Sequence, residues 1–161
     1  MSALELFNAA RARLAEAPRE ALGELVVPRR ILGVARAPRV ERWGAAWHLG
    51  VLLLTDDGVL ATGDIVRARQ EARRGYTAES QRQRAELAAA ARRGGFAEGE
   101  TVHIGWRMLQ PDLVDAGGES GPLVAAAGVA RVRWSAAGGL MSLEAYLAER
   151  VALLLEPPAG A

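Results

Sequence analysis

The sequence of 161 residues contains no lysine and no cysteine, so all 20 of its basic residues are arginine. These two absences exclude several kinds of chemistry. Schiff-base and lysine-base mechanisms need an amine whose pKa can be tuned, and thiol catalysis needs a thiolate. The common phosphate-binding loop needs its lysine, and zinc sites built on cysteine pairs need their thiolates. Arginine is therefore the residue type through which we expect this protein to contact an anion.

Further absences concern targeting and export. The amino-terminal residues lack the basic region and apolar core of a secretory signal, and the apolar run at 49–54 is far shorter than a membrane span. Without cysteine there is no sign of a disulfide framework. The apolar share is 50%, which is ordinary for globular proteins, and the formal net charge of +1 does not indicate nucleic acid. We expect a cytoplasmic protein that has no membrane partner.

Capping signals predict three helices. A serine followed three residues later by Glu or Gln forms a capping box, and both Ser2–Glu5 and Ser80–Gln83 fit that pattern. We expect Gly94 to supply a left-handed cap after the second helix. Ser142 is expected to cap the last helix, which ends before two prolines. The predicted helices span residues 2–17, 80–93 and 142–156, and Leu4, Phe7 and Leu14 should share the buried face of the first.

Two hairpins are predicted from turn residues between apolar runs. Asp57-Gly58 separates the runs 47–55 and 58–66, and the turn should use the positive φ that glycine permits. The second hairpin joins 123–126 to 129–135 near Gly128. Residues 100–108 alternate between apolar and polar, which predicts one strand, and Trp106 and Trp134 should lie in the core. Residues 24–42 should form edge strands, and 110–121 a loop.

These elements predict the fold class. Helices at the beginning, middle and end alternate with antiparallel strands, which is typical of an α+β protein. We expect about five or six strands in one mainly antiparallel sheet. Because no linker divides the chain, we expect one domain over residues 1–161, with a frayed tail from about residue 157.

Arginine clusters suggest where a ligand would bind. The local charge balance is +4 over residues 28–42 and again over 64–93. If the strands at 100–108 and 129–135 were neighbours, their polar faces would extend this basic surface. We predict a non-catalytic ligand-binding or protein-interaction domain, whose ligand is an anionic small molecule or an acidic protein surface. The candidate site residues are Arg39, Arg42, Trp43, His103, Arg107, Arg131 and Arg133.

Two other functions remain open. A small hydrolase would use Ser120 with His103. Ser120 lies in a Gly-Glu-Ser-Gly segment that resembles the nucleophile segment of chymotrypsin-like serine proteases, but one glycine of that pattern is missing and the chain is too short for two barrels. Nucleic-acid binding through residues 67–93 is disfavoured, because only Tyr76 and Phe96 could stack on bases there.

Cofactors, metals and self-association complete the expectations. Two histidines without cysteine do not make a typical zinc site, and we expect no metal and no cofactor. The apolar stripe of the last helix suggests a homo-oligomer. Whether the protein is an enzyme stays open, with the balance against catalysis.

Overall fold

The computed structural model describes residues 1–71 and 78–160, which form four α-helices and eleven strands. The protein is α+β, as predicted, but it has more and shorter elements than the sequence suggested. Its residues group into two compact units. Unit 1 comprises Met1–Arg19, Ala46–Thr62 and Arg107–Ala161, and unit 2 comprises Glu20–Ala45 and Gly63–Trp106. Among the described helices, none combines the length and the apolar character needed to cross a bilayer.

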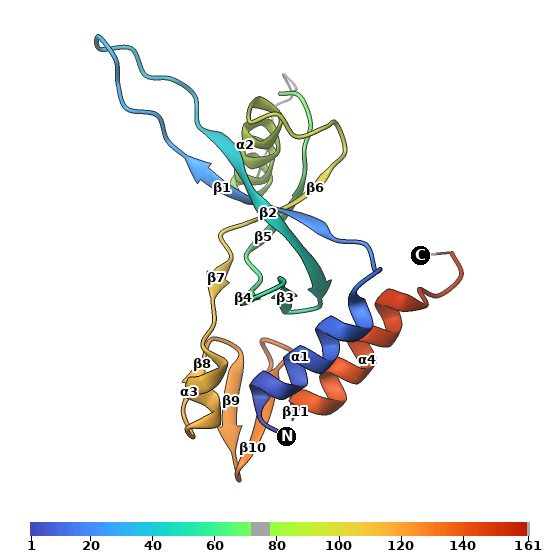
Figure 1. The fold of residues 1–161 in the computed structure, drawn as a ribbon. Coiled ribbons are helices and arrows are strands. Elements are labelled where there is room, and N and C mark those ends of the chain that lie inside the picture. Colours follow the sequence, from blue (N-terminus) through green and yellow to red (C-terminus); the bar gives the residue numbers. More distant parts are fainter. Residues whose placement is uncertain (72–77, 161) are drawn as a thin grey trace. The chain divides into compact units, whose positions relative to one another are not determined.

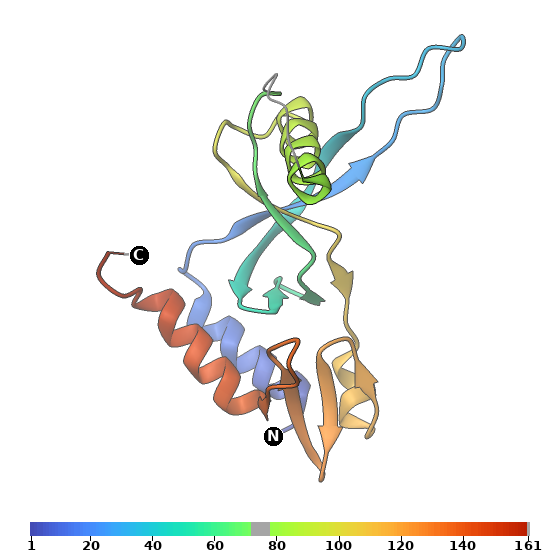
Figure 2. The ribbon, with the colours of Figure 1, turned by 180° about the vertical axis from the view of Figure 1, so that it is seen from behind.

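The helices of unit 1 include both predicted terminal helices. They are α1 (Ala3–Leu14), the short α3 (Pro111–Asp115) and α4 (Leu143–Leu155). The Ser2–Glu5 capping box at α1 is confirmed, and so is the Ser142 cap of α4. Asp115 adds a second cap to α1, because its carboxylate accepts from the backbone N–H of Ala3 at 2.6 Å. Helices α1 and α4 lie side by side (Figures 1 and 2).

Unit 1 contains two antiparallel arrangements of strands. In the first, the end of β2 (Arg39–Leu49) pairs with β3 (Leu52–Leu54), which pairs with β4 (Val59–Ala61), which pairs with β7 (Arg107–Met108). The second is a four-stranded sheet with the order β11-β10-β9-β8. Its strands are β8 (Glu119–Ser120), β9 (Leu123–Ala126), β10 (Val129–Arg133) and β11 (Leu140–Ser142). The hairpin of β9 and β10 turns at Gly128 as predicted.

The core of unit 1 lies between its helices and strands. Phe7 and Leu14 of α1 pack with Leu123 of β9 and Tyr146 of α4. Tyr146 also binds the first hairpin, because its hydroxyl donates to the carbonyl of Leu49 and accepts from the N–H of Val51. This satisfies the polar end of a buried aromatic ring. Leu4, which the sequence placed on the buried face, is 42% exposed instead.

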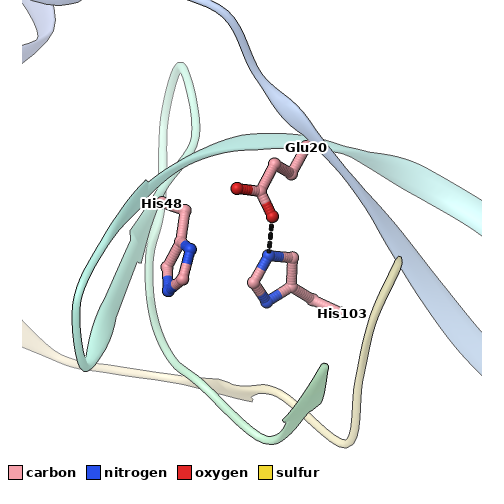
Figure 3. Close-up of side chains that lie close together, drawn as sticks. All are labelled: Glu20, His48 and His103. Carbon is pink, nitrogen blue, oxygen red and sulfur yellow. Dashed lines mark hydrogen bonds and ion pairs between the residues drawn. The ribbon is translucent and has the colours of Figure 1, made fainter. Parts of the chain in front are cut away.

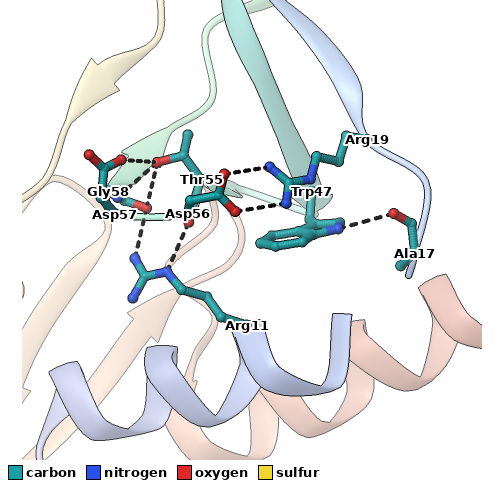
Figure 4. A network of polar contacts seen from close by, with 8 residues as sticks. All are labelled: Arg11, Ala17, Arg19, Trp47, Thr55, Asp56, Asp57 and Gly58. Carbon is teal, nitrogen blue, oxygen red and sulfur yellow. Dashed lines mark hydrogen bonds and ion pairs between the residues drawn. The ribbon is translucent and has the colours of Figure 1, made fainter. Parts of the chain in front are cut away.

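Arginines hold the turn between β3 and β4 (Figure 4). The Arg11 guanidinium donates to the carbonyl oxygens of Thr55 and Gly58, at 2.8 and 3.0 Å. Arg19 lies over the ring of Trp47 and donates two hydrogen bonds to Asp56, which hold the pKa of that carboxyl below its usual range. These arginines fix a loop to its neighbours, so their role is structural.

Unit 2 is a smaller sheet with one helix. Its strand order is β5 (Asp64–Arg67), β6 (Thr101–Ile104), β1 (Glu20–Val26), then the first part of β2. The β1–β6 pair is parallel and the β5–β6 pair is antiparallel, so the strands are mixed. Helix α2 (Glu79–Arg93) buries its Ala88–Ala91 segment in the core of this unit. The link between β1 and β2 extends beyond them as an arm (Figures 1 and 2).

Glycines account for two corrections to the predicted strands. The apolar run 47–55 is two strands, because Gly50 turns the chain at a φ of +67° after β2. The alternating stretch 100–108 is likewise two strands in different units, interrupted at Gly105 with a φ of +72°. A period of two persists across such a break, so the pattern alone does not reveal it.

Four local predictions were also wrong. Gly58 does not take a positive φ, since the Thr55 hydroxyl stabilises this turn instead by accepting from the Gly58 N–H. Ser80 forms no capping box, because α2 begins at Glu79 and its N-cap Ala78 has no capping side chain. Gly94 is not left-handed, at a φ of −77°; Gly95, at +95°, takes that conformation. The predicted loop 110–121 contains α3 and β8.

Candidate functional site

Two of the predicted site residues, Arg107 and Arg133, line one hollow in unit 1. The hollow has a volume of about 300 Å³. The lining residues with polar side-chain groups are the two arginines, Trp134, Thr62 and Ser135. The remaining wall is apolar, and it is formed by Val51, Ala61, Pro122 and Ala136. The hollow therefore combines two fixed positive charges with apolar surface.

Backbone pairing sets the positions of both arginines. Arg107 lies on β7 directly opposite Ala61 of β4. This pairing places Arg107 next to Thr62, the residue after β4, and both residues line the hollow. On β10, the N–H of Arg133 donates to the carbonyl of Pro122 at 2.8 Å. The next N–H, that of Trp134, donates to the carbonyl of Gly139 at 2.9 Å, which closes the turn after the strand. The rim of the hollow is thus built from ordered backbone.

The two guanidinium groups differ in their local partners. Arg133 pairs with Glu119 at 3.3 Å, with half of the arginine side chain and 69% of the glutamate side chain exposed. An exposed pair of this kind contributes little free energy, so a ligand can displace it. Arg107 is exposed, and no described carboxylate forms an ion pair with it. The positive charges of Arg107 and Arg133 are therefore not fully neutralised by described carboxylates.

Trp134 lies in a different environment from the one that its sequence pattern predicts. Its place on an alternating strand predicted a core position, but the side chain is 47% exposed. The reason is that β10 ends at Arg133, so Trp134 begins a turn instead of continuing the buried face. The indole packs against the backbone of Gly139, where an added Cβ would lie 2.5 Å from the ring. The glycine pair at 138–139 was the available sequence signal for this turn.

Arg131, on the same strand, does not line the hollow. It is half-buried and lies opposite Val124 of β9 and Ser142 of β11. The strands carrying Arg107 and Arg131 are not neighbours, because β7 pairs with β4 whereas β10 pairs with β9 and β11. The basic face imagined across two adjacent strands is therefore absent from the described strands.

Two other predicted arginines lie in unit 2 and have carboxylate partners there. Arg39 pairs with Glu41 at 2.6 Å. Arg42 pairs with Glu100 at 2.9 Å and lies over the ring of Phe96. Burial raises the pKa of Glu100, but hydrogen bonds from Arg42 and from the Ala97 N–H outweigh it and lower that pKa overall. These pairs bind each arginine within its own unit.

Trp43, the candidate aromatic residue beside these arginines, is partly exposed and contacts a second tryptophan. The Trp43 ring lies 4.5 Å from the ring of Trp106, centroid to centroid, at an angle of 51°. Trp43 is 47% exposed. Trp106 is half-buried, and its indole N–H donates to the carbonyl of Gly23 at 3.0 Å. The Trp106 indole therefore links the segment after β6 to β1, while nearly half of Trp43 stays exposed.

His103 was expected on a polar strand face, but it is fully buried. Its Nε2 lies 2.7 Å from a carboxylate oxygen of Glu20, on the neighbouring strand β1 (Figure 3). A carboxylate of this kind fixes the orientation and tautomer of an imidazole. The pair offers one nitrogen and one oxygen ligand atom of types that metals accept.

Ser120, the candidate nucleophile, belongs to β8 in unit 1. Its hydroxyl accepts a hydrogen bond from the N–H of Gln110 at 2.9 Å. His103 belongs to unit 2 and has its own partner there. Within unit 1, the hydroxyl therefore has a structural role at the start of α3.

Comparisons with protein-family models, with curated proteins and with solved structures found no match for this chain. Its function is therefore argued from its own residues.

Proposed function

We propose that this protein is a non-catalytic binding module whose ligand is a small carboxylate with an apolar body. The observation that supports this most directly is the meeting of Arg107 and Arg133 at one hollow with an exposed indole. Guanidinium groups form paired hydrogen bonds with carboxylates, and that geometry gives both strength and orientation. The apolar wall and Trp134 would cover the rest of the ligand.

The size of the hollow supports a small ligand. Sites for small molecules span about 300 to 1,000 Å³ and are mostly apolar with a few placed polar groups. The hollow, at about 300 Å³, lies at the lower end of that range. The Thr62 hydroxyl donates a hydrogen bond to the carbonyl oxygen of Val51 at 3.4 Å. A weak internal bond of this length is easily exchanged for one to a ligand.

The test is ligand-dependent stabilisation with matched neutral probes. We expect phenylacetate at about ten times its Kd to raise Tm by about 3–6 °C, from a stabilisation of about 1.4 kcal/mol. Its amide, phenylacetamide, has nearly the same shape without the charge and should give no shift. Added salt should weaken the effect of the carboxylate, because it screens the guanidinium groups.

Substitutions localise the binding. Arg107→Gln and Arg133→Gln should each abolish the shift, whereas Arg13→Gln removes an equal charge from the exposed side of α1 and should leave it unchanged. Equal binding of acid and amide, or equal loss in all three variants, would contradict the proposal.

A cytoplasmic location, an acidic protein partner and self-association remain predictions from sequence. A serine-directed covalent probe tests the hydrolase alternative, and failure to label Ser120 would remove it.

A further inference from the structure

A second basic hollow lies in unit 2, between β5 and helix α2. Its volume is about 530 Å³. Three arginines contribute to its lining: Arg67 ends β5, Arg69 follows it, and Arg84 comes from the second turn of α2. The other lining residues are Ile65, Val66, Gln81 and Ala85. No carboxylate is among these lining residues, so three positive charges face one space.

Some arginines of unit 2 have a carboxylate partner, whereas others, including the three of this hollow, have none among the described residues. Among the described residues, Arg67, Arg69 and Arg84 have no carboxylate within ion-pair distance. Four other arginines of unit 2 do have one: Arg39 with Glu41, Arg42 with Glu100, Arg82 with Glu79, and Arg92 with Glu98. Residues 72–77, which lie outside the described residues, contain no Asp or Glu that could supply the missing partner.

The formal charge of unit 2 as a whole is also positive, which favours an anionic ligand. Unit 2 holds thirteen arginines and nine carboxylates, a formal balance of +4, whereas unit 1 holds seven and ten, a balance of −3. Three unpaired guanidinium groups at one hollow repel one another unless an anion lies between them. A ligand that carries several negative charges would offset this repulsion.

The lining residues also indicate the chemistry of that ligand. Phosphate oxygens accept paired hydrogen bonds from guanidinium forks, and linked phosphates supply several such acceptors within a few ångströms. Among the described residues that line the hollow there is no aromatic side chain on which a base would stack. We propose that this hollow binds a compact ligand that carries two or more linked phosphate groups and is recognised through them.

This site is independent of the carboxylate site in unit 1, because the two share no residue and lie in different units. The failure of either proposal therefore leaves the other intact. The proposal also differs from nucleic-acid binding through residues 67–93. A polynucleotide would extend over many phosphates, whereas the hollow encloses only a few.

The test is calorimetric titration of the full chain with inorganic tripolyphosphate, pyrophosphate and orthophosphate at low ionic strength. We expect affinity to rise in the order orthophosphate, pyrophosphate, tripolyphosphate. Arg67→Gln and Arg84→Gln should each weaken tripolyphosphate binding by about tenfold or more, which is the loss typical of one charged hydrogen bond. These side chains are exposed, so both variants should fold, and circular dichroism would verify it.

The matched control is Arg82→Gln. Arg82 lies on the same helix and carries the same charge, but it pairs with Glu79 and does not line the hollow. We expect this variant to bind tripolyphosphate within about twofold of the unchanged protein, given the small worth of an exposed pair. Equal weakening in all three variants would show a general charge effect and overturn the proposal. So would absent binding of both linked phosphates, or binding of a DNA duplex that tripolyphosphate does not displace.

Discussion

At the scale of single residues, one residue type has three different roles in this chain. Arg11 donates to two backbone carbonyls and fixes a turn. Arg42 pairs with Glu100 on the surface of unit 2. Arg84 has neither kind of partner among the described residues and faces a hollow. Since the sequence contains only arginine as its strong cation, residue identity does not separate these roles, and only the surroundings do.

A glycine gives the clearest prediction at this scale. A Cβ on Gly94 would lie 1.6 Å from the carbonyl oxygen of Val40, while its φ of −77° suits any residue. Gly94→Ala should therefore destabilise through overlap alone, by about 1–3 kcal/mol or more. The measurement is urea-induced unfolding.

The control for that experiment is Gly44→Ala. No atom lies within 4 Å of a Cβ added at Gly44, and its φ is not positive. We expect its unfolding free energy to change by less than about 0.5 kcal/mol, as surface substitutions usually do. Similar losses in the two variants would show that the approach of Gly94 to β2 is not what limits stability.

At the scale of elements, the two predicted capping boxes had different outcomes. Both contain a serine followed three residues later by a suitable acceptor. At α1 the box forms, whereas α2 begins one residue earlier than its signal and lacks a side-chain cap. A capping motif therefore indicates that a helix begins nearby, but packing decides the residue at which it begins.

This difference predicts unequal costs for equivalent substitutions. Ser2→Ala should lower the unfolding free energy by about 1 kcal/mol, because it removes the acceptor of the Glu5 N–H. Ser80→Ala removes no capping bond and should be neutral or slightly stabilising, since alanine has the higher helix propensity. Thermal unfolding of both variants measures this, and a loss at Ser80 equal to that at Ser2 would contradict the assigned start of α2.

At the scale of the whole molecule, the chain builds two separate hydrophobic cores. Leu14 is fully buried in the core of unit 1, and Phe96 is almost fully buried in that of unit 2. The chain passes from one unit to the other four times, including once within strand β2. Neither unit is therefore a continuous segment of sequence, which is why no linker marks their boundary.

Two cores predict local responses to core substitutions. Leu14→Ala should cost about 2–5 kcal/mol and Phe96→Ala about 3–5 kcal/mol. Hydrogen exchange followed by mass spectrometry should then show faster exchange chiefly in the unit that carries the substitution. Uniform acceleration across both units in either variant would instead indicate a single cooperative unit.

Some features of the candidate site could be predicted from the sequence, and others could not. Composition identified arginine as the cation, and the alternation in 129–135 placed Arg131 and Arg133 on one strand. The pattern did not show that Gly105 would divide 100–108 between two units, which carries His103 and Arg107 into different surroundings. Nor did it show the end of β10 that exposes Trp134, because periodicity reports faces only while a strand continues.

The sequence by itself determined the α+β class, the terminal helices, the hairpin at Gly128 and the exclusion of lysine and cysteine chemistry. These depend on local signals: capping residues, turn residues and composition. Only the tertiary structure decided which arginines face a hollow and which pair with partners far apart in the chain, as Arg42 does with Glu100. Such pairs depend on distances between elements, which no local pattern encodes. For a protein whose one strong cation is arginine, those distances separate the arginines that have a described carboxylate partner from those that have none.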